Sequence, residues 1–380
     1  MLAPKLRFKE FNDEWKKEIL NKISTINPKS DNLPNKFIYI DLESVQKGIL
    51  LNKNIIHKIH APSRAQRTVK LNDILFQTVR PYQQNNYFVS EVCDIPYIAS
   101  TGYALIRTNQ DPYFIYTLMH RQDFLNKVLD MCTGTSFPAI NSNDLGTIEI
   151  KIPLKKEQEK ISELFSLLNK KIELQQRKIE VLKMYKRVLT KKLLDYNNYK
   201  KIKLKDVCTF YSGGTPDSKS KNFYTGNIPF IRSGEIHNET TELYITSEAI
   251  KNSSAKMVYK GSVLYALYGA TSGDVSISKI DGAINQAILC INGNNSINNS
   301  FLTIYLAFYR NIIINTYLQG GQGNLSADII KNLIINLPSI EDQTKIVQYI
   351  NSIDKKLYTE NEKLKNIIFF KKYLLQQMFI

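Results

Sequence analysis

The sequence predicts an α+β fold that is built twice, as a pseudo-two-fold internal repeat. Three observations carry this prediction: motifs of the first half recur in the second, short β-type runs fill most of each half, and each half ends in a long segment of helical periodicity. We expect two globular domains with mixed or antiparallel sheets, separated by two long helices that pair as an antiparallel coiled coil.

The internal repeat is clearest in one motif that occurs twice. The first copy, IPLKKEQEKI, holds Pro153 and Gln158, and the second copy, LPSIEDQTKI, holds Pro338 and Gln343. Both pairs are displaced by 185 residues (338 − 153), and the register then holds without a gap along the segment that follows. Solenoid repeats run at about 20–50 residues, so each unit here is a domain plus a connector.

The two units also begin alike and differ in the middle. WKKEILNKIST at 15–25 matches YKKIKLKDVCT at 199–209, and DILF at 73–76 matches SVLY at 262–265. In the interior of the units almost no residue agrees. A shared frame with a divergent interior indicates two readers of different targets on one scaffold.

Each globular part consists of short β-type runs separated by Asn, Pro and Gly. The first holds FIYIDL, DILFQTV, NYFVSEV, IPYIAS and YALIR, then a helix-like segment at 112–131, the loop CTGTSFPAIN and the strand TIEIKIP. The second holds NIPFI, KMVY, SVLYAL, DVSIS and AILCI, then an apolar helix near 300–318, the loop QGGQGNLS and the strand NLIINLP. The common order predicts the same α+β organisation in both.

After each closing proline the apolar residues recur in steps of four and three, which indicates a coiled-coil seam. The seam positions are Ile161, Phe165, Leu168, Ile172, Gln175, Ile179 and Leu182, and then Ile346, Ile350, Ile353, Leu357, Glu360, Leu364 and Ile367. Each helix could simply cover its own domain, but equal length and matched register favour mutual pairing. Antiparallel pairing would bring the end of the second helix, near Ile380, beside the start of the first domain, near Trp15.

These patterns also predict the domain boundaries. We expect a first domain at 1–150, a first spacer helix at 151–198, a second domain at 199–335 and a second spacer helix at 336–380. The run from Ile161 to Leu194 would span roughly 50 Å as a helix, which exceeds one turn of B-DNA at about 34 Å.

The charge balance favours a polyanion or an acidic partner. The chain of 380 residues carries 51 Lys and Arg against 35 Asp and Glu, a net charge of +16, and is 43% hydrophobic, as folded globular proteins are. The excess is concentrated at 151–205, with 17 basic and 6 acidic residues. A lysine-rich solvated helix explains this excess as well as nucleic acid does.

Several function classes are disfavoured by what the sequence lacks. It has no apolar run of membrane-spanning length and no secretory signal pattern, so we expect a cytoplasmic protein without a membrane partner. The four cysteines, Cys93, Cys132, Cys208 and Cys290, have no C-x-x-C spacing and are expected to be packing residues.

No motif of catalysis or cofactor binding stands in the sequence. There is no phosphate loop, no H-E-x-x-H, no G-x-G-x-x-G after a strand, and no aromatic-ended Asn/Asp-Pro-Pro tetrapeptide of amino-methyltransferases. His57 and His60 lack nearby ligands, so no metal site is expected. The segment GGQG at 320–323 follows a helix, which favours a turn over a phosphate cradle. We therefore expect no catalytic residues, with any chemistry supplied by other chains.

The repeated motif resembles the L-P-x-x-E-Q-x-x-I element of the type I restriction-modification system specificity (S) subunits. Asp342 stands where that element has Glu, a change that we expect to be tolerated. The segment SGGTPDSKSKNFYTGNIPFIRSGEI at 212–236 is similar to that family's target-recognition domains. The similarity extends through Gly269, Thr271, Gly273, Asn285 and Gln286. The first domain lacks the Gly-Thr-Pro turn, so its assignment rests on its position and the shared frame.

The resemblance implies a non-catalytic DNA-binding subunit that holds no cofactor itself. In this family two target-recognition domains each read one half of a split, asymmetric site in double-stranded DNA, and the conserved helices set the gap. The helices also dock two modification subunits, which bind S-adenosylmethionine and methylate adenine N6. Restriction subunits that hydrolyse ATP with Mg join them.

Bases are read in the major groove by Arg or Lys at guanine and by Asn or Gln at adenine, from loops that reach the groove. In the first domain the candidate DNA-binding residues are Arg64, Gln66, Arg67, Gln77, Arg80, Tyr82, Gln83 and Gln84. In the second domain they are Lys219, Lys221, Asn222, Tyr224, Arg232, Ser233, Glu235 and Tyr268. For any single one of them, an ordinary exposed loop side chain or a phosphate contact is the more frequent case, because most protein–DNA hydrogen bonds go to the backbone, so the prediction concerns the loops more than their individual members.

Two other classes of function stay open beside the specificity subunit. A self-sufficient DNA-modifying enzyme would bind S-adenosylmethionine by itself, which the missing motifs disfavour. A coiled-coil scaffold for acidic proteins would give no protection of a split DNA site.

Overall fold

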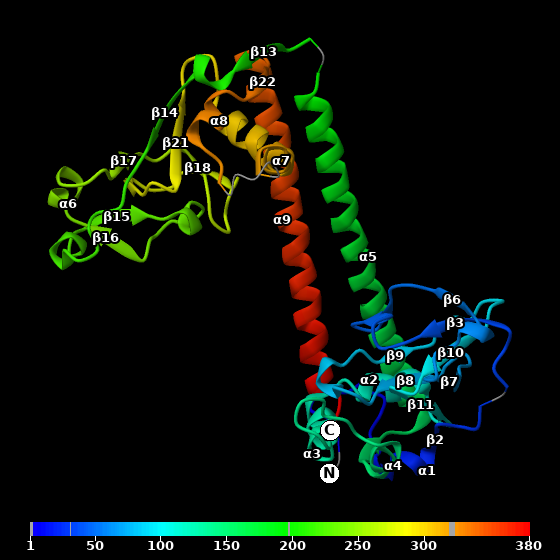
Figure 1. Ribbon diagram of the computed structural model, residues 1–380. Helices are drawn as coiled ribbons and strands as arrows, with labels where there is room; N and C mark the ends of the chain where they lie inside the picture. The colour runs from blue at the N-terminus through cyan, green and yellow to red at the C-terminus, as the bar shows by residue number, and fades with distance from the viewer. Residues whose placement is uncertain (1–2, 31, 197, 319–323) are drawn as a thin grey trace. The chain divides into compact units, whose positions relative to one another are not determined.

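The computed structural model describes residues 3–30, 32–196, 198–318 and 324–380 (Figure 1). The chain divides into two compact units. Unit 1 comprises residues 1–177 together with 362–380, and unit 2 comprises residues 178–361. The division falls inside both long helices, α5 (Lys155–Leu194) and α9 (Ile340–Gln377).

Unit 1 holds two four-stranded sheets and two two-stranded ribbons, β1 with β12 and β4 with β5. Its strands are β1 (Lys16–Ile19), β2 (Ser24–Ile26), β3 (Lys36–Ile40), β4 (Val45–Gln46), β5 (Ile49–Leu50), β6 (Asn54–His57), β7 (Ala65–Thr68), β8 (Ile74–Gln77), β9 (Tyr87–Phe88), β10 (Tyr97–Ser100), β11 (Tyr103–Thr108) and β12 (Glu149–Ile152). Its short helices are α1 (Leu20–Ile23), α2 (Pro112–Leu118), α3 (Gln122–Asp130) and α4 (Ser142–Thr147), with 3-10 turns η1 (Lys58–His60) and η2 (Pro81–Gln83).

Unit 2 has a similar set of elements, without a counterpart of the β4-β5 ribbon among its described residues. Its strands are β13 (Lys200–Lys203), β14 (Cys208–Ser212), β15 (Ile228–Ile231), β16 (Leu243–Ile245), β17 (Lys256–Val258), β18 (Val263–Ala266), β19 (Val275–Ile277), β20 (Gly282–Ile284), β21 (Ile288–Gly293) and β22 (Ile334–Leu337). Its helices are α6 (Ser247–Lys251), α7 (Asn299–Leu318) and α8 (Ala327–Lys331), with 3-10 turns η3 (Leu204–Asp206), η4 (Lys221–Tyr224) and η5 (Ser233–Glu235).

The sheet topology of the two units is the same. The orders β6-β3-β10-β7 and β2-β11-β8-β9 in unit 1 correspond to β16-β15-β20-β17 and β14-β21-β18-β19 in unit 2. In each unit the central pair of the first sheet, β3 with β10 or β15 with β20, is parallel and the other pairs are antiparallel. The ribbon of β1 with β12 has its counterpart in β13 with β22. The predicted mixed sheets and internal repeat are confirmed.

The segment at 112–131, predicted as helix-like, forms two helices, because the helical conformation is interrupted between α2 and α3. Arg121 takes an extended backbone there, and the Tyr116 carbonyl oxygen lies 2.8 Å from Nδ1 of His120. The predicted helix near 300–318 is confirmed as α7. The GGQG segment at 320–323 lies outside the described residues.

The helices pair within each unit, as the seam predicts. In unit 2, Lys178 on α5 pairs with Glu360 on α9 at 2.9 Å, and Lys186 on α5 pairs with Asp354 further back on α9, so the two segments run antiparallel. All fourteen predicted seam side chains, in both repeats, are buried or half-buried. The polar step of the second seam, Glu360, is buried, and its ion pair compensates the desolvation of the carboxylate.

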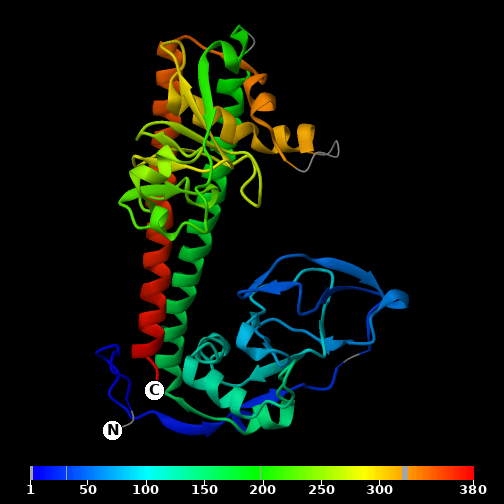
Figure 2. The ribbon, with the colours of Figure 1, turned by 60° about the vertical axis from the view of Figure 1, so that its left-hand side comes forward.

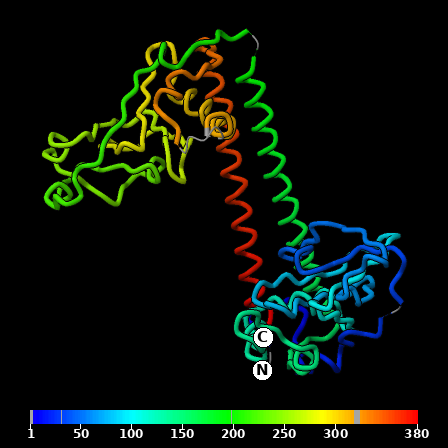
Figure 3. Tube along the Cα trace, viewed as in Figure 1, coloured from blue at the N-terminus to red at the C-terminus, as the bar shows by residue number. Residues whose placement is uncertain are grey.

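The chain end completes the core of unit 1, as antiparallel pairing predicts (Figures 1 and 2). The Phe379 ring lies 6.1 Å from the Trp15 ring, 5.2 Å from Phe114 and 5.8 Å from Phe165, measured between ring centroids. Leu6 N–H donates to the Gln377 carbonyl at 2.9 Å. The trace in Figure 3 shows the C terminus within this unit, next to the N-terminal segment.

The glutamine of the repeated motif is a buried clamp in both units. Gln158 Nε2 donates to the carbonyl of Pro153 at 2.9 Å, and its Oε1 accepts from the backbone N–H of Asp111. Gln343 Nε2 donates to the carbonyl of Pro338 at 2.9 Å, and its Oε1 accepts from Asn298 N–H. Each amide thereby ties the start of a long helix to the segment that opens α2 or α7.

The neighbouring acidic position of the motif differs between the units. Glu157 is buried and receives two hydrogen bonds from Arg7, at 2.8 and 2.7 Å. Asp342 instead pairs with Ser339, whose hydroxyl donates to the carboxylate at 2.8 Å and accepts from Asp342 N–H. Ser339 thus caps the first turn of α9, and the Asp342 carboxylate accepts from the capping hydroxyl.

The cysteines only partly fit the packing role. Cys208 and Cys290 are buried and Cys132 is half-buried, whereas Cys93 is exposed, so the prediction is wrong for that residue. None of the described helices is long and apolar enough to cross a membrane.

The clamp generates a paired prediction. Replacing Gln158 by Leu leaves the Pro153 carbonyl and the Asp111 N–H buried without partners, which should destabilise unit 1 by about 2–4 kcal/mol. The Gln343→Leu substitution should do the same to unit 2. Hydrogen exchange followed by mass spectrometry should show faster exchange in the mutated unit and unchanged exchange in the other, and equal effects on both units would contradict a local clamp.

Candidate nucleic-acid interface

In unit 1 the turn between β10 and β11 joins the two segments that carry the candidate residues. The Thr101 N–H donates to the Arg64 carbonyl at 2.9 Å. Thr78 donates to the Gly102 carbonyl through both its N–H, at 3.0 Å, and its hydroxyl, at 2.8 Å. The segments at 64–67 and 77–84 are therefore held at the same end of the unit, although they are separate in the sequence.

Several of these candidates are exposed to solvent. Arg64, Gln66, Tyr82 and Gln83 are exposed, with Tyr82 at 51%. Gln66 Nε2 donates to the carbonyl of Ser63 at 2.7 Å, which holds its amide close to the loop. Gln84, at the end of η2, is half-buried and has a left-handed backbone with φ +52°.

Arg67 is placed differently from its exposed neighbours. Its Nε donates to the carbonyl of Tyr103 at 2.8 Å, and the side chain is half-buried. Burial lowers the pKa of Arg67, from a starting value so high that the guanidinium stays charged at neutral pH. Its role in the loop is at least partly structural.

Gln77, which the sequence places among the exposed loop candidates, is buried at 1% exposure. Its Nε2 donates to the carbonyl of Val79 and to Oε1 of Gln83, both at 2.8 Å, and its Oε1 accepts from Asn85 N–H at 3.0 Å. Gln77 is thus a brace for the η2 turn and is no longer a candidate for contacting bases. The sequence held a signal for this role, because Gln77 is the last residue of β8 and follows three apolar residues that are all buried.

In unit 2 the turn between β20 and β21 has the corresponding role. Thr215 donates to Oε1 of Gln286 at 2.7 Å, and Leu267 N–H donates to the Ala287 carbonyl at 2.8 Å. Gly213 is required before the Thr-Pro turn, because a Cβ there would lie 1.7 Å from the carbonyl oxygen of Ile284. Sequence reasoning noted Gln286 only as part of the family resemblance, and missed the matching turn at 101–102.

Some candidates of unit 2 are exposed, and others are half-buried or already hydrogen-bonded within the unit. Lys219, Lys221 and Asn222 are exposed. The Tyr224 hydroxyl donates to the Pro216 carbonyl at 2.7 Å, and burial raises the pKa of Tyr224. Tyr268 is half-buried, and burial likewise raises its pKa. Ser233 is half-buried in η5.

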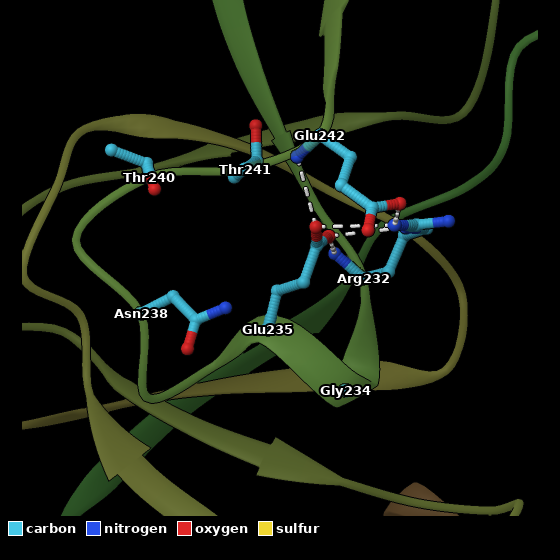
Figure 4. Close-up of a pocket in the computed structure, with 7 residues that line it drawn as sticks. All are labelled: Arg232, Gly234, Glu235, Asn238, Thr240, Thr241 and Glu242. Carbon is cyan, nitrogen blue, oxygen red and sulfur yellow. Dashed lines mark hydrogen bonds and ion pairs between the residues drawn. The ribbon is translucent and has the colours of Figure 1, made fainter.

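Arg232 is neutralised by two carboxylates (Figure 4). Its guanidinium contacts Glu235 at 3.1 Å through Nε and through Nη2, and Nη2 also pairs with Glu242. Hydrogen bonding to Glu235 raises the pKa of Arg232. Burial alone would raise the pKa of Glu235, but the hydrogen bonds from Arg232 and from the backbone N–H of Glu242 lower it on balance.

This ion-pair cluster lines an open depression of about 550 Å³. The lining residues are Arg232, Gly234, Glu235, Asn238, Thr240, Thr241 and Glu242. With two carboxylates against one guanidinium the depression is acidic, so it does not suit a phosphate. Arg232 and Glu235 therefore stabilise the loop around η5. The exposed Lys219, before η4, and Lys221, its first residue, are the better candidates for contacting a polyanion.

Neither unit shows a metal centre in its described residues, since no group of three His, Cys, Asp or Glu side chains converges there. His237 makes an isolated contact, with Nε2 at 3.0 Å from Asp274. That contact ties η5 to the loop after β18.

The comparisons with known proteins agree on one family. The family described as Type I restriction modification DNA specificity domain matches residues 12–184 and again 196–368. The specificity subunit of the HindI type I restriction enzyme from Haemophilus influenzae is 27% identical over 175 residues, which cover 42% of this chain and 36% of that protein. The corresponding MjaIX subunit from Methanocaldococcus jannaschii is 29% identical over 44% of this chain and 40% of that protein. These alignments thus span well under half of both relatives.

Longer alignments come at lower identity. The MjaVIII specificity subunit of Methanocaldococcus jannaschii is 21% identical over 89% of this chain and 80% of that protein. The crystal structure of the type I restriction-modification S subunit from M. genitalium superposes with a TM-score of 0.60 at 16% identity, over 100% of this chain and 99% of the other. A structure from a study of type I R-M complex assembly has a TM-score of 0.65 at 21% identity, over 96% and 97% of the two chains. At such identities the structures establish the fold alone.

The brace at Gln77 can be tested against its exposed neighbour Gln66. The Gln77→Leu substitution removes three hydrogen bonds, so amide exchange at 78–86 should accelerate by roughly 10- to 100-fold. Gln66→Leu is the control and should leave that exchange unchanged. Equal exchange in both variants would show that the turn does not need the amide.

Proposed function

Because the chain belongs to the family of type I restriction modification DNA specificity domains and carries that domain twice, we propose that it selects the DNA sites of a type I restriction-modification complex. In this proposal the chain is the non-catalytic subunit. Partner subunits bring S-adenosylmethionine and ATP, methylate adenine and cleave DNA.

One observation carries the proposal: the two units share the strand order of both four-stranded sheets, whereas their loops carry different side chains. A common frame presents loops at corresponding places, and different donors and acceptors there read different bases. Each domain accordingly reads one half of a bipartite, asymmetric site in double-stranded DNA.

We assign 1–150 and 199–335 as the target-recognition domains, and 151–198 and 336–380 as the spacer helices. The DNA contacts proposed for the first domain are Arg64, Gln66, Arg80, Tyr82 and Gln83, and those for the second are Lys219, Lys221, Asn222 and Tyr268. The net charge of +16 supports binding to a polyanion and predicts an affinity that falls steeply with salt.

Both units also expose an apolar helix face, and the two faces are related by the repeat. In unit 2, Met184, Tyr185 and Val188 of α5 are exposed, Met184 at 67%. In unit 1, the positions 185 residues later on α9 are Phe369, Phe370 and Tyr373, which are exposed as well, Phe369 at 73%. The shared register is that of the motif at Pro153 and Pro338.

These two faces are our proposed docking sites for two copies of the modification subunit. Clustered exposed apolar side chains on a helix mark an interaction surface. Lysines flank each face, Lys183 and Lys186 in unit 2 and Lys371 and Lys372 in unit 1. Because Lys183 and Lys186 already pair with Glu180 and Asp354, the partner is expected to offer an apolar groove. Two repeat-related faces fit two copies of the same partner.

Domain replacement tests the modular reading of DNA. Replacing residues 1–150 by the first domain of another specificity subunit should change one half of the methylated site and leave the other half and the gap unchanged, because the second domain and the helices are retained. Single-molecule methylation mapping of cells with the complete system measures this. A change in both halves, or in neither, would rule out separate reading.

Charge introduced into the docking faces tests the partner assignment. Met184→Glu and Phe369→Glu should each reduce the number of bound modification subunits from two to one, and the double variant should bind none, because a buried unpaired carboxylate costs several kcal/mol. Native mass spectrometry of the purified complex counts the copies. Lys170→Glu, an exposed position of α5 outside both faces, should keep two copies, and two copies in all variants would exclude these faces.

A further inference from the structure

The loop after β8 in unit 1 and the loop after β18 in unit 2 are structural counterparts. Thr78 in the first accepts at its carbonyl from Ile140 N–H at 3.1 Å, and Leu267 in the second accepts from Leu325 N–H at 3.1 Å. Ile140 and Leu325 are themselves 185 residues apart, in the register of the repeat. Two residues beyond these carbonyls stand Arg80 and Gly269.

Arg80 and Gly269 share a left-handed backbone, with φ +54° and +86°. Glycine takes this conformation without penalty, whereas a long side chain there costs about 1 kcal/mol or more. Unit 2 shows that glycine satisfies the loop geometry. The arginine in unit 1 is therefore held at a conformational cost, which indicates that its side chain is needed at that place.

The side chain of Arg80 is stacked on an aromatic ring. Its Cζ lies 4.3 Å from the ring centroid of Phe137, and its backbone N–H donates to the Pro138 carbonyl at 2.7 Å. Phe137 is 61% exposed, although one face of its ring makes a cation–π contact with the guanidinium. Within the described part of the chain the guanidinium makes no hydrogen bond, and its Nε is buried without a partner.

A guanidinium seated on an aromatic face has a fixed plane, and because Nε of Arg80 is buried, its two Nη groups are the donors that it can offer to a base. That edge matches the paired acceptors O6 and N7 of guanine in the major groove. The brace of Gln77 on the η2 turn, next to Arg80, limits the motion of the loop that presents this edge. If Arg80 only contacted a phosphate, its charge would suffice, and neither its left-handed backbone nor its contact with the Phe137 ring would be needed.

We propose that Arg80 reads a guanine in the DNA half-site of the first domain and that Phe137 is its positioning residue. The assignment rests on the proposed function and adds Phe137 to the residues that decide the site. Gly269 has no side chain to do the same in the second domain, so the reading of guanine from this position is confined to the first.

The test is methylation mapping of the complete system, with domain replacement to identify which half-site belongs to the first domain. Arg80→Lys keeps the charge but loses the planar fork, so preference for one guanine in that half should fall roughly 10- to 100-fold. Arg80→Gly should give the same loss, with the backbone that Gly269 already uses. Phe137→Leu should weaken preference at the same base by a smaller factor, and the second half-site should not change.

Lys47→Gly is the matched control, since Lys47 is an exposed cation with φ +50°. It relieves the same backbone strain and removes one charge, yet it should leave the base preference intact. Unchanged preference in Arg80→Lys, or an equal loss in Lys47→Gly, would overturn the assignment. Should Arg80→Gly fail to fold, Arg80→Lys decides alone. Failure of the proposed function is distinguishable, because then no split site would be methylated under the control of this chain.

Discussion

The packing of a helix end from one repeat into the core of the other is the constraint on which both units depend. The Phe379 ring, at the end of the second repeat, lies among Trp15, Phe114 and Phe165 of the first. In unit 2, Leu194 at the end of the first long helix is fully buried and its carbonyl accepts from Asn336. Neither repeat closes its apolar core alone, so the folding of each unit requires a segment from the other half of the chain.

This packing of helix ends separates the parts of the chain in which substitutions disturb the fold from the loops in which they do not. The seam positions are buried or half-buried, so substitutions there remove packing. The clamps Gln158 and Gln343 are buried and bonded to backbone groups, so substitutions there leave polar groups unpaired. The loops at 64–84 and 215–235 rest on that frame, and many of their side chains point to solvent. A protein that must acquire new targets without refolding is served by this division.

Features that follow from a regular pattern along the sequence were predictable, whereas contacts between particular side chains were not. The seam, the strand order and the approach of Trp15 to the C terminus follow from periodicity and from a repeat in fixed register, because these patterns are written along the chain. The roles of Gln77 and Arg232 were not visible in the same way. Gln77 is buried at the end of its strand and bonds to the Val79 carbonyl in the loop that follows. Arg232 pairs with Glu242, which lies ten residues further along the chain, across a loop.

The sequence by itself determined that the chain is two copies of one α+β frame with paired helices and an excess of positive charge, since periodicity, repeat offset and composition are local or additive properties. Only the tertiary structure decided which polar side chains are free. Loop residues such as Arg80 and Phe137 are 57 positions apart (137 − 80), and they meet where the neighbouring residues Val79 and Ala139 form an isolated β-bridge. The physical reason is that a side chain's availability depends on burial and partners, which the folded chain supplies from distant positions.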